Sequence, residues 1–405
     1  MFMNRKSFKH WAVVAVLCGM AAASLGLCVN CSGVFFTPIA NDLGLKRGSV
    51  AMTATIATFM SAISSIVVPK VLNRKNLKLL IGIGTVMAAG STLLMSLCSS
   101  LWQFYVLAFI RGFGIGFFAM VMITLIVNRW FRARNGLATS ITMSFSGLCG
   151  ALGSPVFTSL INAQGWRTAY VVMGVVNVLL CLPAILMPFT LDPADCGLAP
   201  YGADAPGQVK KQTQEEGTAS VTAVMIGMMM VMAFLGSGLT SFTQHLPAVS
   251  EQFGYTASVG ALTLSFALVG NIISKLVIGV LSDRFGARRA YQIVMAINLA
   301  AILLLLTVRI SFVSLAAAFF FGWVYASAGV GMSLLTRSYV GNKRYADVYP
   351  IVNLAGSTGA ALILSVIGYI YDFAGSYIPA ILTVLAMNLI VMLLTFLIQA
   401  AASKK

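Results

Sequence analysis

A lysine and an asparagine one helical turn apart are the residues of this chain best placed for chemistry. Lys275 lies inside a long apolar run, eight residues before Asp283. In a helix eight residues span about 12 Å, more than the lysine side chain can cover to reach the helix end. A charge so deep in a span costs about 2.5–3.5 kcal/mol on insertion scales, so it predicts a water-filled cavity and an anionic partner. Asn271 lies on the same helix face and can donate to the same carboxylate. The alternative for Lys275 is a snorkelling or structural side chain.

Three other side chains in apolar runs suit an anion or a proton. Arg111 is a second cation inside a span, followed by three alternating glycines. Small residues permit close helix approach, so Arg111 is either held by facing carbonyls or is a second anion contact or part of a proton path. Tyr325 is either an aromatic in a helix seam or a hydrogen-bond donor to a carboxylate. Histidine is the side chain whose ordinary pKa lies near neutrality, so His245 is a candidate for proton coupling as well as for a structural role.

Carboxylates and catalytic motifs are missing from the apolar runs. All ten Asp and Glu fall in loops or at span ends, which leaves none to neutralise a cationic substrate or relay protons. The sequence has no H-E-x-x-H, G-x-S-x-G or P-loop, and its two histidines are too few for most metal or hydrolytic sites. Cys28 and Cys31 form a lone C-x-x-C in an apolar run, which favours packing over metal binding. We expect no enzyme activity, no bound metal and no cofactor.

The composition predicts the elements that must position these residues. Of 405 residues 59% are hydrophobic and 9% charged, and the mean hydropathy is +0.93, which excludes an ordinary soluble protein. A spanning helix takes about 20 residues, so the length suits about twelve spans. The expected fold is an all-α polytopic membrane protein. Apolar runs predict helices at 11–37, 48–70, 77–99, 102–126, 134–162, 166–190, 221–249, 256–282, 288–309, 312–336, 346–371 and 377–401.

The spans divide into two similar halves. The segment 191–220 is polar and lacks an apolar period, so it predicts a cytoplasmic linker between six-helix halves at 1–190 and 221–405. Breaker, charge and glycine positions match between the halves at an offset of 209 to 210 residues. This indicates two parallel repeats, the construction expected of a transporter with a central site. The matched positions include Pro38 with Pro247, Gly44 with Gly254, Arg74 with Arg284, Gly112 with Gly322, and Arg134 with Arg344.

The basic residues are distributed unevenly. The formal charge is +16, which in a soluble protein would suggest nucleic acid. Twenty Lys and Arg fall in the tails and loops on the side of the two termini, against four on the other side. By the positive-inside rule both termini are expected in the cytoplasm, with the protein in the plasma or inner membrane and no nucleic-acid partner.

The loop after the eighth span carries a family resemblance. The run G-V-L-S-D-R-F-G-A-R-R at 279–289 resembles the signature loop of the major facilitator superfamily, and N-R-K at 73–75 resembles its degraded partner. Such a loop can form a charge network between helices that holds the cytoplasmic face shut, the alternative being a plain basic cluster. The expected gate residues are Asp283, Arg284, Arg288 and Arg74.

A finer resemblance lies within that superfamily. The run W-F-R-A-R-N-G-L-A at 130–138 is similar to the fifth-helix motif of monocarboxylate transporters and oxalate/formate antiporters. N-C-S-G-V-F at 30–35 resembles their first helix, and the pattern of Asn271 and Lys275 resembles their eighth. This implies a substrate contact at Asn30 as well. The chain departs from the pattern, because Lys275 stands where Arg is typical and Asn30 where animal monocarboxylate transporters carry Lys.

These observations predict a secondary active transporter of small organic anions that works by alternating access. Monocarboxylates of the lactate, pyruvate or formate type are the expected substrates. The expected coupling is proton symport, with Lys275 as well as His245 as candidate coupling residues, or anion exchange. A single Lys275 in the cavity balances one carboxylate better than two, and the resemblance favours Tyr325 as a further contact. The alternatives are an oxalate or dicarboxylate antiporter, an exporter of larger lipophilic organic anions or drugs, and a transporter-like membrane sensor. The expected partners are the lipid bilayer and the substrate anion, with the protein functional as a monomer.

Overall fold

Helices make up nearly the whole of the described chain. The computed structural model describes residues 5–132, 134–202, 222–307 and 310–403. Within them eleven stretches are long and apolar enough to cross a membrane. One of these, Leu137–Leu186, contains Gly165 at φ 83°, so two helices meet there. The twelve predicted spans are thereby accounted for, and the predicted all-α membrane fold is confirmed.

The chain separates into two compact units. Unit 1 comprises Met1–Leu43 and Ile56–Lys210, and unit 2 comprises Gly44–Thr55 and Lys211–Lys405. The helix α3 (Arg47–Val71) therefore contributes residues to both. The other elements of unit 1 are α1 (Arg5–Ala21), the π-helix η1 (Ala22–Asn30), α2 (Gly33–Leu43), α4 (Leu77–Met95), α5 (Leu101–Gly116), α6 (Met120–Trp130), α7 (Asn135–Leu186) and the short 3-10 turn η2 (Pro193–Cys196).

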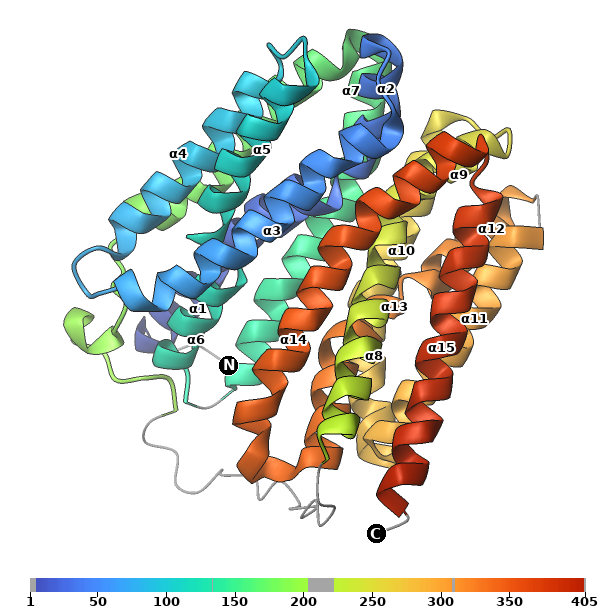
Figure 1. Cartoon of the computed structure of the whole chain (residues 1–405). Helices are drawn as coiled ribbons and strands as arrows, with labels where there is room; N and C mark the ends of the chain where they lie inside the picture. The colour runs from blue at the N-terminus through green and yellow to red at the C-terminus, as the bar shows by residue number, and fades with distance from the viewer. Residues whose placement is uncertain (1–4, 133, 203–221, 308–309, 404–405) are drawn as a thin grey trace. The chain divides into compact units, whose positions relative to one another are not determined.

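Apart from the start of α3, unit 2 is built from the helices coloured yellow-green to red in Figure 1. Its α8 packs along α14, and α10 packs against both α11 and α12. The elements are α8 (Ala223–Phe242), η3 (Thr243–His245), α9 (Leu246–Gln252), α10 (Ala257–Phe285), α11 (Ala287–Thr307), α12 (Ser311–Phe321), α13 (Val324–Ala326), the π-helix η4 (Ser327–Gly331), α14 (Met332–Ala374) and α15 (Ile378–Ser403).

Several predicted spans are interrupted. The span expected at 11–37 consists of α1, the nine-residue η1 and α2. The span expected at 102–126 ends its first helix at Gly116 and resumes at Met120, and the one at 312–336 is divided into α12, α13 and η4. Hydropathy does not register such breaks, because the residues on both sides stay apolar. Non-α turns inside helices are frequent at functional sites.

Matching glycine contacts lie in the two units. In unit 1 a Cβ on Gly112 of α5 would overlap the carbonyl oxygen of Ala57 in α3, and in unit 2 a Cβ on Gly322 would overlap that of Ala267 in α10. Both members of the pair are shifted by the same 210 residues. The predicted repeat is therefore present in the packing, and each unit uses it to bring two backbones into direct contact.

The first turns of α3 are held by α14 within unit 2. The Asp372 carboxylate accepts hydrogen bonds from the backbone N–H groups of Arg47 at 3.0 Å and Gly48 at 2.7 Å. Further along the helix, the Thr55 hydroxyl donates to the Ala361 carbonyl at 2.7 Å. The first N–H groups of a helix have no partner within it, so a carboxylate from a distant helix satisfies them and meets the positive end of the helix dipole.

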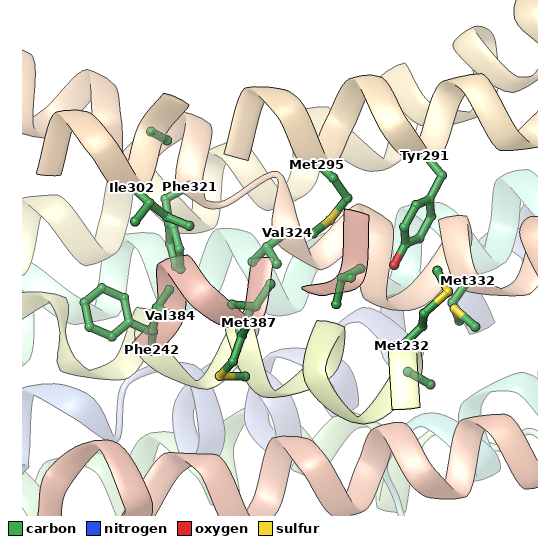
Figure 2. Packing of buried hydrophobic residues seen from close by; sticks show 14 of the residues in the cluster. Met232, Phe242, Tyr291, Met295, Ile302, Phe321, Val324, Met332, Val384 and Met387 are labelled. Atoms are coloured by element: carbon green, nitrogen blue, oxygen red, sulfur yellow. The ribbon is translucent and has the colours of Figure 1, made fainter. Parts of the chain in front are cut away.

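The core of unit 2 is apolar and rich in methionine. Figure 2 shows Tyr291 of α11 with its hydroxyl on the side of Met332 and Met232. This hydroxyl is buried and has no hydrogen-bond partner among the described residues. The same cluster joins α8, α11 and α15 through Phe242, Met295 and Val384, among others.

Two glycines of α10 should respond differently to alanine. A Cβ on Gly270 would overlap the Phe319 carbonyl oxygen, whereas nothing lies within 4 Å of one on Gly279. We expect Gly270→Ala to lower the free energy of unfolding by about 1–3 kcal/mol, since the helices must move apart. Gly279→Ala should be neutral or stabilising by up to about 1 kcal/mol. Thermal melting of both variants in detergent checks this, and equal melting temperatures would contradict the close crossing.

Asp42 in unit 1 should make stability depend on acid pH. Its carboxylate accepts from the Arg167 guanidinium at 2.7 Å and from the Trp166 indole at 2.9 Å, and these bonds lower the pKa of Asp42. A lowered pKa stabilises the fold above the unfolded value of about 3.9, and this contribution is lost as the pH falls through the folded value. Asp42→Asn should thus melt below wild type at neutral pH, with the difference shrinking below about pH 4. A difference that grows on acidification would contradict this.

Candidate functional site

Lys275 lies on α10 next to the interrupted span of unit 2. The contacts of Gly270 with Phe319 and of Gly322 with Ala267 hold α10 against the end of α12, and Lys275 follows Gly270 by little more than one turn. On the same face of α10 Asn271 and Ile278 are buried, whereas Lys275 itself is half-buried. A lysine at this depth has its stem among apolar groups while its ammonium requires water or an anion.

The polar atoms around Lys275 are short of partners. In the part of unit 2 that the structure describes, no carboxylate lies within ion-pair distance of its ammonium. The side-chain oxygen of Asn271, one turn earlier, is buried and accepts no hydrogen bond there. An isolated cation beside an unsatisfied amide inside a span is costly. Such a pair is suited to holding a polar ligand.

Tyr325 lies on a neighbouring element of the same unit. It belongs to α13, and its hydroxyl donates to the Thr240 carbonyl of α8 at 3.4 Å. The helix α13 packs against α10, where Ile278, on the same face as Lys275, shares an apolar cluster with Ala326. Tyr325 and Lys275 are therefore carried by adjoining elements, although the described contacts include none between the two side chains. Their roles toward a substrate stay predictions.

His245 is engaged within the core of unit 2. It is buried at the junction of α8 and α9, where Nε2 donates to the Leu364 carbonyl at 2.8 Å. Its Nδ1 lies 3.4 Å from the Tyr377 hydroxyl. Both ring nitrogens thus have partners, an arrangement that holds a neutral tautomer in place. A role in proton coupling stays a prediction.

Arg111 is buried in unit 1 without a carboxylate. Only 3% of the residue is exposed. Its polar contact in the described chain is a weak one, from Nη1 to the Met95 sulfur at 3.7 Å, and its Nε has no partner among the described residues. The backbone carbonyls that would hold a structural arginine are not among its contacts in this part of the chain. This leaves donors free for an anion.

Asn30 fastens the end of η1 to α7. Its side-chain amide donates to the Ser146 carbonyl at 3.1 Å, and the residue is buried. A Cβ on Gly26, four residues earlier, would overlap the side chain of Cys149. The π-helical segment therefore lies directly against α7. Whether Asn30 also contacts a substrate stays a prediction.

The expected gate residues have separate surroundings. The guanidinium of Arg74 pairs with Asp192 at 3.3 Å and with Asp195 at 3.0 Å, both within unit 1. In unit 2 the Arg288 guanidinium lies over the Tyr339 ring at 4.3 Å. Arg284 lies over the ring of the adjoining Phe285, and the side chain of Asp283 lies outside the described residues.

Sequence reasoning missed the structure of the first part of the expected linker. Residues 191–202 lie against the rest of unit 1, where Tyr201 pairs with Phe131 in a short parallel bridge. The backbone N–H of Tyr201 donates to the Trp130 carbonyl at 2.8 Å, and the buried His10 donates to the Ala199 carbonyl at 2.9 Å. The available signal for this docking was Asp192, an acidic residue in a chain whose neighbouring loops are basic. Paired surface charges are common, however, and seldom identify a specific contact.

The profile of the Major Facilitator Superfamily matches residues 17–269 and 226–405. The chain belongs to this superfamily. As a superfamily member it is a multi-pass membrane transporter rather than an enzyme, which confirms the broader of the two resemblances.

Individual relatives of this superfamily member are distant. It is 24% identical over 286 residues to the MFS-type transporter pytF of Aspergillus terreus, covering 69% of this chain and 91% of that protein. It is 24% identical over 378 residues to the purine ribonucleoside efflux pump NepI of Salmonella typhimurium, covering 90% and 87%. The crystal structure of a mutant of the nucleoside transporter NupG aligns at a TM-score of 0.74 with 12% identity, over 95% of this chain and 99% of that one. The fold is shared, whereas the finer resemblance to monocarboxylate and oxalate/formate transporters stays a prediction.

The surroundings of Arg111 predict how its removal affects stability. A buried cation without a carboxylate or carbonyl partner destabilises the fold, so an apolar side chain of similar length should be tolerated. We expect Arg111→Met to melt at or above the wild-type temperature in detergent. Arg167→Met, which removes a cation paired with Asp42, should melt lower. A loss of several degrees in Arg111→Met alone would show that the guanidinium has a structural partner.

Proposed function

We propose that this secondary transporter carries small organic anions, with monocarboxylates such as lactate, pyruvate or formate as the preferred class. The observation that carries the proposal is Lys275, a half-buried cation seven residues inside the end of the span Ala257–Ser282, with no ion pair in the described part of unit 2. A bound carboxylate would supply the missing charge, and the neighbouring Asn271 amide would donate to it through its nitrogen.

Charge balance favours one carboxylate over two. Away from the span ends, the described part of unit 2 offers Lys275 as a cation, and unit 1 offers Arg111. If Arg111 keeps its place in the interior of unit 1, a dianion such as oxalate would leave one carboxylate without a partner. Larger lipophilic anions or drugs, and a sensor built on this fold, remain rival proposals.

Nucleosides are a second candidate substrate class, because of the similarity to NepI over most of the chain. A nucleoside is neutral and would leave Lys275 uncompensated. It would, however, offer donors to the unsatisfied Asn271 oxygen and a ring for Tyr325. The two candidates therefore differ in what they require of Lys275.

The organisation of the transporter forms part of the proposal. We place both termini in the cytoplasm of a plasma or inner membrane, since twenty basic residues lie in tails and loops on that side. The halves 1–190 and 221–405, joined by the segment 191–220, would alternate access with Arg74, Asp283, Arg284 and Arg288 as gate residues. Proton symport or anion exchange supplies the driving force, and the monomer is the working unit.

Flux measurements on Lys275 variants test the substrate class. In proteoliposomes, labelled lactate, pyruvate, formate, oxalate and adenosine should be compared with and without a pH gradient or internal anion. We expect lactate or another monoanion to be transported best, and Lys275→Gln to lose at least about 90% of that flux while still inserting. Lys275→Arg should keep part of it, because the charge remains. The exposed Lys9→Gln serves as control and should retain wild-type flux.

Two outcomes would overturn the proposal. Wild-type monoanion flux in Lys275→Gln would remove Lys275 from the site. Transport of adenosine, unaffected by Lys275→Gln and not inhibited by any of the carboxylates, would assign the protein to neutral substrates.

A further inference from the structure

The interrupted span of unit 2 releases a backbone carbonyl at Phe321. In an unbroken helix the amide of Tyr325 would donate to this carbonyl, but it donates to that of Gly322 at 3.2 Å instead. The next turn tightens in the same way, with the Ala326 amide donating to the Trp323 carbonyl at 3.0 Å. The change of hydrogen-bond register falls directly before Tyr325, and it frees a strong acceptor inside the apolar bundle.

Two buried asparagines form a chain of hydrogen bonds that ends at that carbonyl. The side-chain amide of Asn298 in α11 donates to the Phe321 carbonyl at 2.8 Å. The side-chain amide of Asn388 in α15 donates to the Asn298 side-chain oxygen, also at 2.8 Å. Both asparagines are fully buried, with 0% of each residue exposed. The two bonds link three elements of unit 2 at the position of the break.

The same residue is held through its ring. Phe321 packs edge-on against Phe242 at the end of α8, with ring centroids 5.5 Å apart, and Figure 2 shows its ring beside Ile302. Four residues further on, the Tyr325 hydroxyl reaches the Thr240 carbonyl of α8. The break is therefore fixed by α8 on its ring side and by α11 and α15 on its carbonyl side.

We infer that Asn298 and Asn388 are positioning residues for Tyr325: they hold the break open at Phe321, which sets where the Tyr325 hydroxyl lies. Without the two side-chain amides, the backbone N–H of Tyr325 would donate to the Phe321 carbonyl, as in a regular helix. The helix would then continue through the break. Continuation alters the register of Tyr325 and swings its hydroxyl away from Thr240. The consequence for transport rests on the proposed function, in which Tyr325 contacts the substrate.

The order of the bonds distinguishes the two asparagines. Asn298 acts directly on the carbonyl, whereas Asn388 acts by orienting the Asn298 amide, since its own side-chain oxygen has no partner among the described residues. Removing Asn388 should therefore have no further effect once Asn298 is gone. Such non-additivity is expected of groups that act through one contact.

A measurement independent of substrate tests the positioning itself. Hydrogen–deuterium exchange of the detergent-solubilised full chain should report the backbone amides at 322–331. We expect Asn298→Leu and Asn388→Leu to change exchange there about tenfold relative to wild type, with other peptides unaffected. The matched control is Thr395→Val in α15, because the buried Thr395 hydroxyl bonds the Val391 carbonyl of its own helix. Unchanged exchange at 322–331 in both asparagine variants would overturn the inference.

Lactate uptake in proteoliposomes tests the link to Tyr325. Asn298→Leu, Asn388→Leu and Tyr325→Phe should each raise the KM for lactate several-fold with a smaller effect on the maximal rate. The Asn388→Leu change should add nothing to the KM in either an Asn298→Leu or a Tyr325→Phe background. If the increases in KM of the single variants multiplied in the double variants, the inference would be overturned. A lowered maximal rate at unchanged KM would also overturn it.

The two readouts separate failure of the inference from failure of the proposed function. If wild-type protein transports no lactate but exchange at 322–331 still depends on both asparagines, the positioning stands and the substrate assignment falls. If a leucine variant does not fold, Asn388→Ser and Asn298→Ser, which are smaller and polar, take its place in the exchange experiment with the same expected result.

Discussion

A backbone carbonyl released inside an apolar helical bundle must find a donor, and asparagine side chains meet this requirement at two of the interruptions described in the two units. At Phe321 the donor is Asn298. In unit 1, Asn177 of α7 donates to the Ala23 carbonyl in the π-helix η1 at 3.4 Å. At these two segments a polar side chain on another helix supplies the donor, so both breaks depend on the packed unit as well as on their own sequence.

Two of the residues first considered as substrate contacts are already engaged with other helices. Asn30 and His245 both lie at irregular points of their spans and both donate to a carbonyl of another helix, those of Ser146 and Leu364. Lys275 and Arg111 differ from them, because neither has a carboxylate or carbonyl partner in the described chain. An unmet charge points to a ligand more directly than an amide or imidazole whose bonds are already made.

The sequence predicted the spans and the repeat but not the interruptions. Hydropathy identifies a span because lipid selects apolar side chains over its whole length, and the pairing of Gly112 and Gly322 was visible at a constant offset. The end of α12 at Phe321 was not visible, because its cause is Asn298, which lies in the preceding span. The docking of 191–202 was missed for a similar reason. It depends on the pairing of Tyr201 with Phe131, which is distant in the sequence, and no local pattern predicts that contact.

The glycine contacts and the asparagine bonds together explain how a lysine can be retained near the middle of a span. Gly270 and Gly322 bring α10 and α12 into backbone contact just before the break. Beyond that contact α12 ends, and the chain continues as short, differently wound segments held by Asn298. A continuous helix at the same distance would keep packing against α10 with apolar side chains and would cover the position of Lys275. The break thus lies beside Lys275, which is half-buried, whereas Asn271 and Ile278 on the same face of α10 are buried.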